Sequence, residues 1–317
     1  MKKIIGYGLL TILLLISGCS NSIEPSTTSL VEEQPPTENP VISSGVKVIS
    51  NLEYSKVGNN SLLLDLYFPD TYLLENTSAL PVIIYVHGGG WRKGDKRECP
   101  AKELATELLT EGYVIACIDY RLSGQAKFPA QIQDVKAAVR WLRANAIKYN
   151  LNPDQFGAWG ISAGGHLVSL LGTSGNITEF ESGDNLEYSS QVQAVVDWFG
   201  SVDPLKIIGL NEVHTEYYEA VGELLGTSKL EQYSIEKVNT INPITYITAD
   251  DPPFLIMHGD QDKTVPFNQS LIFYQALIKN KINSTLYEAK GEGHSLDDPK
   301  YIKMMVSFFD LHLKNKQ

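Results

Sequence analysis

Short apolar runs alternate with amphipathic stretches along the chain from residue 46 almost to its end. The runs have the length of strands and stop at turn-forming residues, whereas the stretches between them space apolar positions three or four residues apart. In residues 130–150, for example, Ile132, Val135, Val139 and Leu142 fall on one helical face. The predicted strands are residues 46–57, 61–69, 81–86, 113–122, 155–160, 192–200, 253–259 and 284–290.

Helices are predicted between these strands. They cover residues 98–111, 130–150 and 162–171, and a last helix starts at Asp298-Pro299, where proline at the first helical position loses no hydrogen bond. Strands that alternate with helices predict a mostly parallel sheet covered on both faces, here preceded by two antiparallel strands. Residues 201–251 are too long for a usual connection and contain helix-like stretches, so we interpret them as a small excursion over the sheet edge.

The first 18 residues have the layout of an export signal. Lys2 and Lys3 precede an almost wholly apolar run that ends in small residues, and this run is too short to span a membrane as a helix. The stretch Ile16-Ser17-Gly18-Cys19 resembles the bacterial lipobox, which predicts a lipidated Cys19 as the first mature residue. We therefore expect residues 1–18 to be a lipoprotein signal peptide and the protein to be exported and anchored to the cell-envelope membrane, facing outward.

The next segment is rich in Ser, Thr, Pro and Glu and has little to bury. Such a composition predicts a disordered tether over residues 19–45. The folded domain is then expected to cover residues 46–317.

Composition and charge narrow the possible partners. The chain has 26 Lys and Arg against 37 Asp and Glu, a formal net charge of −11, and no long basic run, so nucleic-acid binding is not expected. Of the three cysteines, none forms a CxxC pair, which argues against a structural metal site. Cys117 lies in an apolar run and has the character of a small buried hydrophobic residue, while its pairing with Cys99 is left open.

The strongest chemical motif is Gly160-Ile161-Ser162-Ala163-Gly164, which lies between a predicted strand and a predicted helix. A sharp strand-to-helix turn exposes the serine oxygen, and the flanking glycines avoid backbone clashes. Ser162 is therefore the candidate nucleophile.

A second motif, His87-Gly88-Gly89-Gly90-Trp91, ends an apolar strand. Consecutive glycines leave backbone N–H groups bare, so that these groups can converge on the oxygen of a tetrahedral intermediate. The N–H of Ala163, directly after the serine, is a further donor of this kind. A flexible glycine-rich turn is the alternative interpretation.

A serine nucleophile needs a base and an orienting carboxylate, which in this type of fold follow in the order acid, then histidine. His294 in GEGHS and Asp262 in HGDQDKTVP both follow late strands, at the sheet edge where Ser162 is expected. Asp260 competes with Asp262. The other histidines are interpreted as packing or bracing residues; they are His87, His166, His214, His258 and His312.

Five segments along the chain resemble those of bacterial α/β-hydrolases related to feruloyl and acetyl esterases, a group near the hormone-sensitive-lipase-like carboxylesterases. The segments are HGGGW, DYRLSGQAKFPAQIQDVKAAVRWLRANA, GISAGGH, DPPFLIMHGDQDKTVP and GEGHS. The resemblance implies an α/β-hydrolase fold, a small ester or acylated-carbohydrate substrate, and no metal or organic cofactor. It also implies site residues: the triad Ser162, Asp262 (in preference to Asp260) and His294, and the oxyanion-hole donors Gly89, Gly90 and Ala163.

Other functions remain open at this stage. HGGGW also fits the HGGxW pattern of kynurenine formamidases, although an export signal does not suit a metabolic enzyme of that kind. A prolyl-oligopeptidase-like peptidase would normally carry a propeller domain, which this chain lacks. A surface lipoprotein that binds carbohydrate or a protein partner without catalysis is the alternative from another class. Trp91, Trp198 and Tyr217 are candidates for lining a substrate cleft or for core packing.

Overall fold

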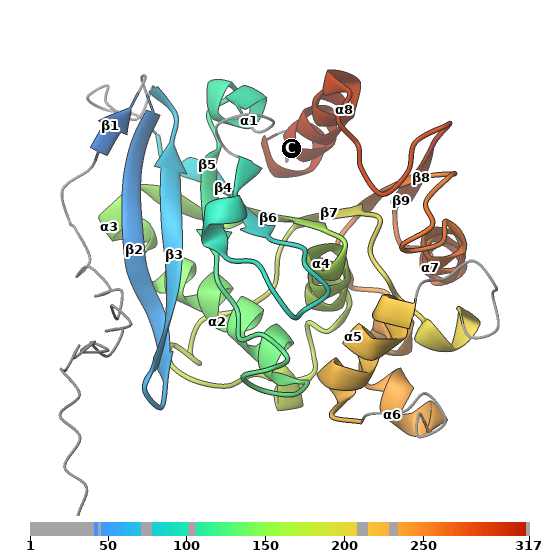
Figure 1. Cartoon of the computed structure of the whole chain (residues 1–317). Coiled ribbons are helices and arrows are strands. Elements are labelled where there is room, and N and C mark those ends of the chain that lie inside the picture. The colour runs from blue at the N-terminus through green and yellow to red at the C-terminus, as the bar shows by residue number, and fades with distance from the viewer. Residues whose placement is uncertain are drawn as a thin grey trace, which may run out of the picture. The chain divides into compact units, whose positions relative to one another are not determined.

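The computed structural model describes residues 41–43, 46–70, 78–100, 106–207, 215–227 and 234–314. Within these residues the strands form one nine-stranded sheet in the order β1-β2-β3-β5-β4-β6-β7-β8-β9 (Figure 1). The predicted signal peptide (1–18), Cys19 and most of the predicted tether (19–45) lie outside the described residues, so they stay predictions.

The sheet begins with antiparallel strands and continues as a parallel sheet. β1, β2, β3 and β5 pair antiparallel, whereas β5, β4, β6, β7, β8 and β9 pair parallel, as the sequence predicted. The first strand precedes Val46, because residues 41–43 of the predicted tether already pair with β2. The strands are β1 (Val41–Ser43), β2 (Val46–Val57), β3 (Asn60–Phe68), β4 (Leu80–Val86), β5 (Val114–Ile118), β6 (Leu151–Ile161), β7 (Ala194–Trp198), β8 (Phe254–Gly259) and β9 (Ser284–Ala289).

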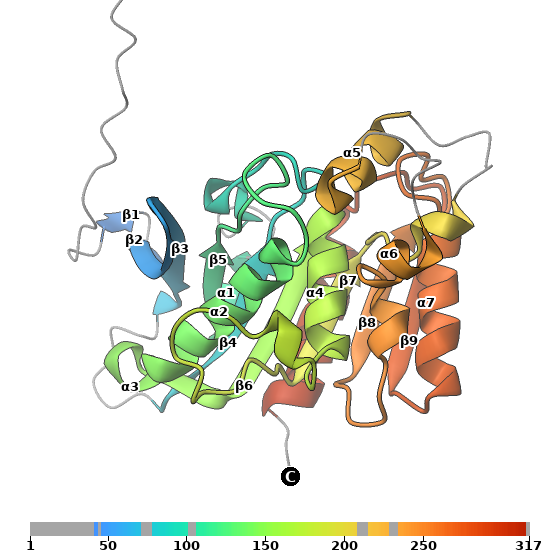
Figure 2. The ribbon, with the colours of Figure 1, turned by 90° about the horizontal axis from the view of Figure 1, so that it is seen from below.

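Helices cover both faces of this sheet (Figures 1 and 2). Alternate residues of β4 point to opposite faces, so Ile84 joins the core under α2, α4 and α7, while Tyr85 joins the core under α1 and α8. Burial on both faces explains why the parallel strands are continuous apolar runs. The α-helices are α1 (Thr106–Thr110), α2 (Ala130–Ala144), α3 (Ala146–Tyr149), α4 (Ala163–Thr173), α5 (Thr215–Leu225), α6 (Ile235–Asn239), α7 (Asn268–Lys279) and α8 (Pro299–Phe309).

The start of α8 follows the sequence prediction. The Asp298 side chain accepts a hydrogen bond from the Lys300 backbone N–H, and Pro299 occupies the first turn. The predicted helix 98–111 is wrong at its start: Glu98 ends a short 3-10 turn, η2 (Lys96–Glu98), and Cys99 is extended. Pro100 explains this difference, because a residue before proline is disfavoured in the helical region.

Residues 201–251 form the predicted excursion between β7 and β8. Their described part contains α5, α6 and the 3-10 turns η5 (Pro204–Lys206) and η7 (Pro243–Tyr246). Figure 2 shows α5 beyond the edge of the sheet at which α4 begins. The excursion therefore adds material beside the turn that carries Ser162.

A disulfide bond links two of the three cysteines. Cys99 and Cys117 form a disulfide with their Cα atoms 5.8 Å apart, which answers the pairing question that the sequence left open. Within the described ranges, no helix is both long and apolar enough to cross a membrane.

Candidate active site

Ser162 lies in the tight turn between β6 and α4 with a φ of 55°, in the left-handed region that side chains rarely adopt. Its neighbours make this turn possible. A Cβ atom at Gly160 would lie 2.2 Å from the Gly164 carbonyl oxygen, and one at Gly164 would lie 2.0 Å from the carbonyl oxygen of Val86. The Ser162 N–H also donates to the Trp198 carbonyl at 2.9 Å, which ties the turn to β7. The glycines on either side of Ser162 thus allow the backbone conformation that this serine adopts.

The structure brings Ser162, His294 and Asp262 together from three separate loops. His294 Nε2 lies 2.9 Å from Ser162 Oγ, and His294 Nδ1 lies 2.6 Å from Asp262 Oδ2. The Asp262 side chain is completely buried, whereas 24% of the His294 side chain is exposed. A substrate can therefore reach the serine and the imidazole but not the carboxylate.

Asp262 is held in its ionised form by its surroundings. Oδ1 accepts backbone N–H bonds from Thr264 and Val265, at 2.8 and 2.9 Å. Burial by itself would raise the pKa of the Asp262 carboxyl, but hydrogen bonds from His258, His294 and the Val265 N–H outweigh it and hold that pKa well below its ordinary value. The carboxylate is thus a permanent acceptor for His294.

The glycine loop lies beside the serine. A Cβ atom at Gly88 would be 3.5 Å from Ser162 Cβ, and Gly89 and Gly90 adopt φ values of 102° and 62°. The N–H groups of Gly89, Gly90 and Ala163 donate no hydrogen bond to another described residue. Three backbone donors near Ser162 are therefore available to an oxyanion.

Two other buried histidines brace this loop. His87 stacks on Tyr120, with ring centroids 4.3 Å apart, and its Nδ1 lies 2.8 Å from the Gly88 oxygen. His166 accepts from Trp91 Nε1 at 3.1 Å and, through Nε2, donates to the backbone oxygen of Ile241 at 2.7 Å. Burial lowers the pKa of His166 to about 4, which favours the neutral ring that this pattern requires. Neither imidazole bonds to Ser162, in agreement with the packing roles predicted for them.

The other described residues that the sequence suggested do not take part in the triad. Asp260 accepts from the Gly291 N–H at 2.8 Å and pairs with Lys290, so it does not bond to His294. His312 lies on the last, π-helical turn and contacts Phe308, while His214 is outside the described residues. The three cleft candidates are packed into the hydrophobic cores instead; Trp91, Trp198 and Tyr217 are 3%, 2% and 8% exposed.

Sequence reasoning missed Phe199 and the role of α5 at this site. The Phe199 ring lies 4.5 Å from the His294 ring, centroid to centroid, directly after β7. Ala220 of α5 would be 3.6 Å from a Cβ atom at Gly90, and Arg92 forms ion pairs with Glu219 and Glu223 of the same helix. These contacts join segments far apart in the chain, so no local pattern indicates them.

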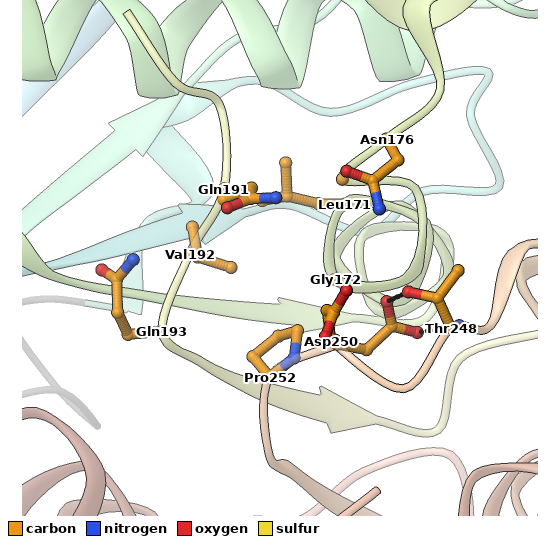
Figure 3. A pocket seen from close by; sticks show the side chains of 11 residues that line it. Leu171, Gly172, Asn176, Gln191, Val192, Gln193, Thr248, Asp250 and Pro252 are labelled. Carbon is orange, nitrogen blue, oxygen red and sulfur yellow. Dashed lines mark hydrogen bonds between the residues drawn. The ribbon is translucent and has the colours of Figure 1, made fainter. Parts of the chain in front are cut away.

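A groove of about 230 Å³ is lined by residues other than those of this site. Figure 3 shows the side chains that line it. It is lined by the end of α4 (Leu171, Gly172) and by residues just ahead of β7 and β8, such as Gln193 and Pro252. It therefore opens at the sheet edge opposite to Ser162. In the part of the chain that the structure describes, no three His, Cys, Asp or Glu side chains are grouped as metal ligands would be.

The sequence matches a known family and known relatives. The family described as BD-FAE matches residues 64–277. LipM of Mycobacterium tuberculosis, a probable carboxylic ester hydrolase, is 32% identical over 233 residues, which are 71% of this chain and 51% of the relative. A probable isoprenylcysteine alpha-carbonyl methylesterase of Arabidopsis thaliana is 29% identical and covers 72% of this chain and 47% of its own length. The chain spans about half the length of these relatives.

Solved structures show the same fold. A truncated carbohydrate esterase from gut microbiota superposes with a TM-score of 0.74 and 30% identity, over 89% of this chain and 100% of its own. The esterase Est2 of the planctomycete Thermogutta terrifontis has a TM-score of 0.68 and 26% identity, over 86% of this chain and 95% of its own. The predicted α/β-hydrolase fold is confirmed.

Proposed function

The chain belongs to the BD-FAE family, and on that premise we propose that it is a serine carboxylic ester hydrolase. One observation carries the proposal: a continuous hydrogen-bonded path from Ser162 Oγ through His294 to the buried Asp262 carboxylate. This arrangement activates a hydroxyl as a nucleophile, and bare backbone N–H groups lie beside it. The esterases among its relatives support the same reaction class.

In the proposed mechanism, His294 Nε2 removes the Ser162 proton while Oγ attacks the ester carbonyl. The N–H groups of Gly89, Gly90 and Ala163 stabilise the oxyanion. Asp262 keeps the proton of His294 on Nδ1 and stabilises the imidazolium, which then protonates the leaving alcohol. Water then loses a proton to His294 as it attacks the acyl-enzyme, and the imidazolium returns that proton to Ser162 Oγ as the acid leaves.

For the substrate we propose a short acyl ester or an acetyl or feruloyl ester on a carbohydrate. Two neighbours support this choice: one is named a carbohydrate esterase, and the Thermogutta esterase has been solved with butyrate bound. The glycine loop lies close to the serine, since a Cβ atom at Gly88 would be 3.5 Å from Ser162 Cβ. Ala220 of α5 packs against Gly90 of that loop. This limited space favours a small acyl group.

We also propose that the protein is exported and anchored through a lipidated Cys19. The signal-like residues 1–18 motivate this, and the disulfide between Cys99 and Cys117 supports it, since disulfides persist in oxidising compartments. Mass spectrometry of the native N-terminus tests the proposal. An unmodified Cys19, or a mature chain that begins elsewhere, contradicts it.

Hydrolysis assays test the reaction and the substrate class together. The purified protein is given 4-nitrophenyl acetate, butyrate and decanoate, methyl ferulate and N-formylkynurenine. We expect turnover of the short esters and a loss of kcat of about 10³-fold or more in Ser162→Ala. An unchanged rate in Ser162→Ala removes the serine from the mechanism, and preferred turnover of N-formylkynurenine makes the enzyme a formamidase.

A matched pair of variants tests the acid. Asp262→Asn should lower kcat severely because the amide favours the wrong tautomer of His294, by as much as about 10⁴-fold. Asp260→Asn should have little effect, since Asp260 bonds to Gly291 and Lys290. Equal losses in both variants contradict the assignment.

A further inference from the structure

A second imidazole contacts the carboxylate of the triad. His258 is the fifth residue of β8 and its side chain is completely buried. Its Nε2 atom lies 3.2 Å from Asp262 Oδ2, the same oxygen that lies 2.6 Å from His294 Nδ1. The two rings therefore share one carboxylate oxygen.

The other contacts of His258 determine where its proton lies. Nε2 is 2.8 Å from the Val265 carbonyl oxygen, which can only accept, so Nε2 must carry a hydrogen. This N–H is shared between the Val265 oxygen and Asp262 Oδ2. On the far side of the ring, Nδ1 lies 2.7 Å from the Ser270 hydroxyl of α7, which fixes the ring plane. His258 thus points a donor at Asp262.

This donor completes the coordination of the carboxylate. Oδ1 is held by two backbone N–H groups, from Thr264 and Val265, and Oδ2 by two imidazoles. Without His258, Oδ2 would be held by His294 only, and the carboxylate would be fixed less firmly about its bond to Cβ. We infer that His258 is a positioning residue: it orients the Asp262 carboxylate and takes part of its negative charge away from His294.

The inference rests on the proposed ester hydrolase activity and predicts two changes in the kinetics when the His258 donor is lost. A misaligned carboxylate slows proton transfer by His294, so kcat falls, whereas KM changes little because His258 does not reach the substrate side of the triad. An Oδ2 atom freed from the His258 N–H carries more charge toward His294, so the acid limb of the pH–rate profile moves to higher pH.

Other groups near His258 also affect the pH–rate profile. Asp197 of β7 interacts with it electrostatically, and the rings of Phe199 and Phe267 lie 6.2 and 5.7 Å away. Within the described residues, the carboxyl groups that interact with His258 are those of Asp262 and Asp197. Asp197 is the same in all the variants compared below, so it causes no difference between their pH–rate profiles.

The experiment compares three variants of the full chain. His258→Leu removes the donor, His258→Gln restores an amide N–H donor, and Ile256→Ala destabilises the same strand at a buried residue that makes no hydrogen bond to Asp262. For each we measure the thermal midpoint and the pH dependence of kcat and KM on 4-nitrophenyl acetate. We expect His258→Leu to lose about 10²-fold in kcat with an upward shift of the acid limb. His258→Gln should recover part of both, and Ile256→Ala should lower the thermal midpoint with an unchanged profile.

Two results overturn the inference. One is a kcat and pH profile of His258→Leu equal to those of the native chain. The other is a loss in His258→Leu that matches Ile256→Ala and leaves the acid limb in place, which makes His258 a packing residue only. Should His258→Leu fail to fold, His258→Met takes its place, since its side chain also lacks an N–H donor. A native rate and profile in His258→Met, with an unmoved low-field proton resonance of the His294–Asp262 hydrogen bond, then refutes the inference. Failure of the proposed function is separate, because it shows as full activity in Ser162→Ala.

Discussion

At the scale of the residue, backbone contacts around Ser162 leave no room for side chains on the flanking glycines. A Cβ atom at Gly164 would lie 2.0 Å from the Val86 oxygen and 2.6 Å from that of His87. We expect Gly164→Ala to lower the free energy of unfolding by about 3 kcal/mol or more, because two backbone segments must separate. Urea unfolding measures this. Gly124→Ala is the control, since its new methyl group would meet Glu223 at an ordinary 3.5 Å; equal effects of both changes contradict the close-approach explanation.

The buried carboxyl of Asp197, on the strand next to the serine turn, should make the stability of the protein depend on pH. Asp197 is fully buried, accepts from Ser169 Oγ and the Gly200 N–H, each at 2.9 Å, and burial raises its pKa to about 6. A raised acid pKa means that its contribution to stability is complete below the unfolded value, about 3.9, and is lost as the pH rises through 6.

Asp197→Asn should remove this dependence. Relative to the variant, the native chain should lose about 3 kcal/mol of unfolding free energy between roughly pH 3 and pH 8, since each pKa unit corresponds to about 1.4 kcal/mol. Urea unfolding of both proteins across this range measures the difference, in which the shared carboxyls cancel. A difference that does not vary with pH shows that Asp197 keeps an ordinary pKa.

At the scale of the element, α5 limits the position of the glycine loop. The Ala220 methyl group faces Gly90, where a Cβ atom would meet it at an ordinary contact distance of 3.6 Å. The three further carbon atoms of a leucine at position 220 would therefore have to displace the loop or the helix. We expect Ala220→Leu to lower kcat by about 10-fold or more, because backbone donors near Ser162 move away from the oxyanion. Glu216→Leu, at an exposed position of the same helix, should keep the native kcat. A native rate in Ala220→Leu shows that the loop is independent of α5.

The disulfide connects two elements at the start of the parallel sheet. It joins the residue after η2 to the fully buried Cys117 of β5, across a sequence separation of 18. Closing a loop of this size stabilises a protein by about 3 kcal/mol, mainly through the unfolded chain. The double variant Cys99→Ala/Cys117→Ala should therefore unfold at lower urea concentration, and a reductant should shift the native protein but not the variant. Equal shifts in both proteins contradict the bridge.

At the scale of the whole sheet, the antiparallel part and the parallel part have different roles. The antiparallel strands β1 to β3 close one edge, whereas Ser162, Asp262 and His294 all follow parallel strands at their carboxyl ends. This division explains why the loops near the antiparallel edge contribute nothing to the triad.

A shortened chain tests this division. A chain that starts at Val46 loses β1, whose three residues pair with β2 at the edge of the described sheet. We expect its kcat/KM to equal that of the full chain and its solubility to fall, because β2 becomes an unpaired edge. Parallel ester assays and light scattering measure both. A large loss of kcat/KM contradicts the separation of edge and site.

Much of the site was predictable from local sequence. The glycines of Gly160–Gly164 require a tight turn at Ser162, and loops that follow late strands of an α/β sheet meet at one edge, which placed Asp262 and His294 near it. The strands were predictable for a similar reason, since burial on both faces leaves apolar runs of strand length. The one helix with a wrong start, at residue 98, failed where Pro100 outweighed the apolar pattern.

The tertiary structure decided what depends on distances between remote segments. It separated Asp262 from Asp260, two residues apart, because only one of them points at His294. It paired Cys99 with Cys117, brought α5 against Gly90 and placed His258 on the triad carboxylate. Periodicity and glycine spacing describe the conformation of a segment and the face it buries, and they determined the fold and the serine turn. Contacts across the sheet arise only when all segments pack at once, so no single stretch of sequence contains them.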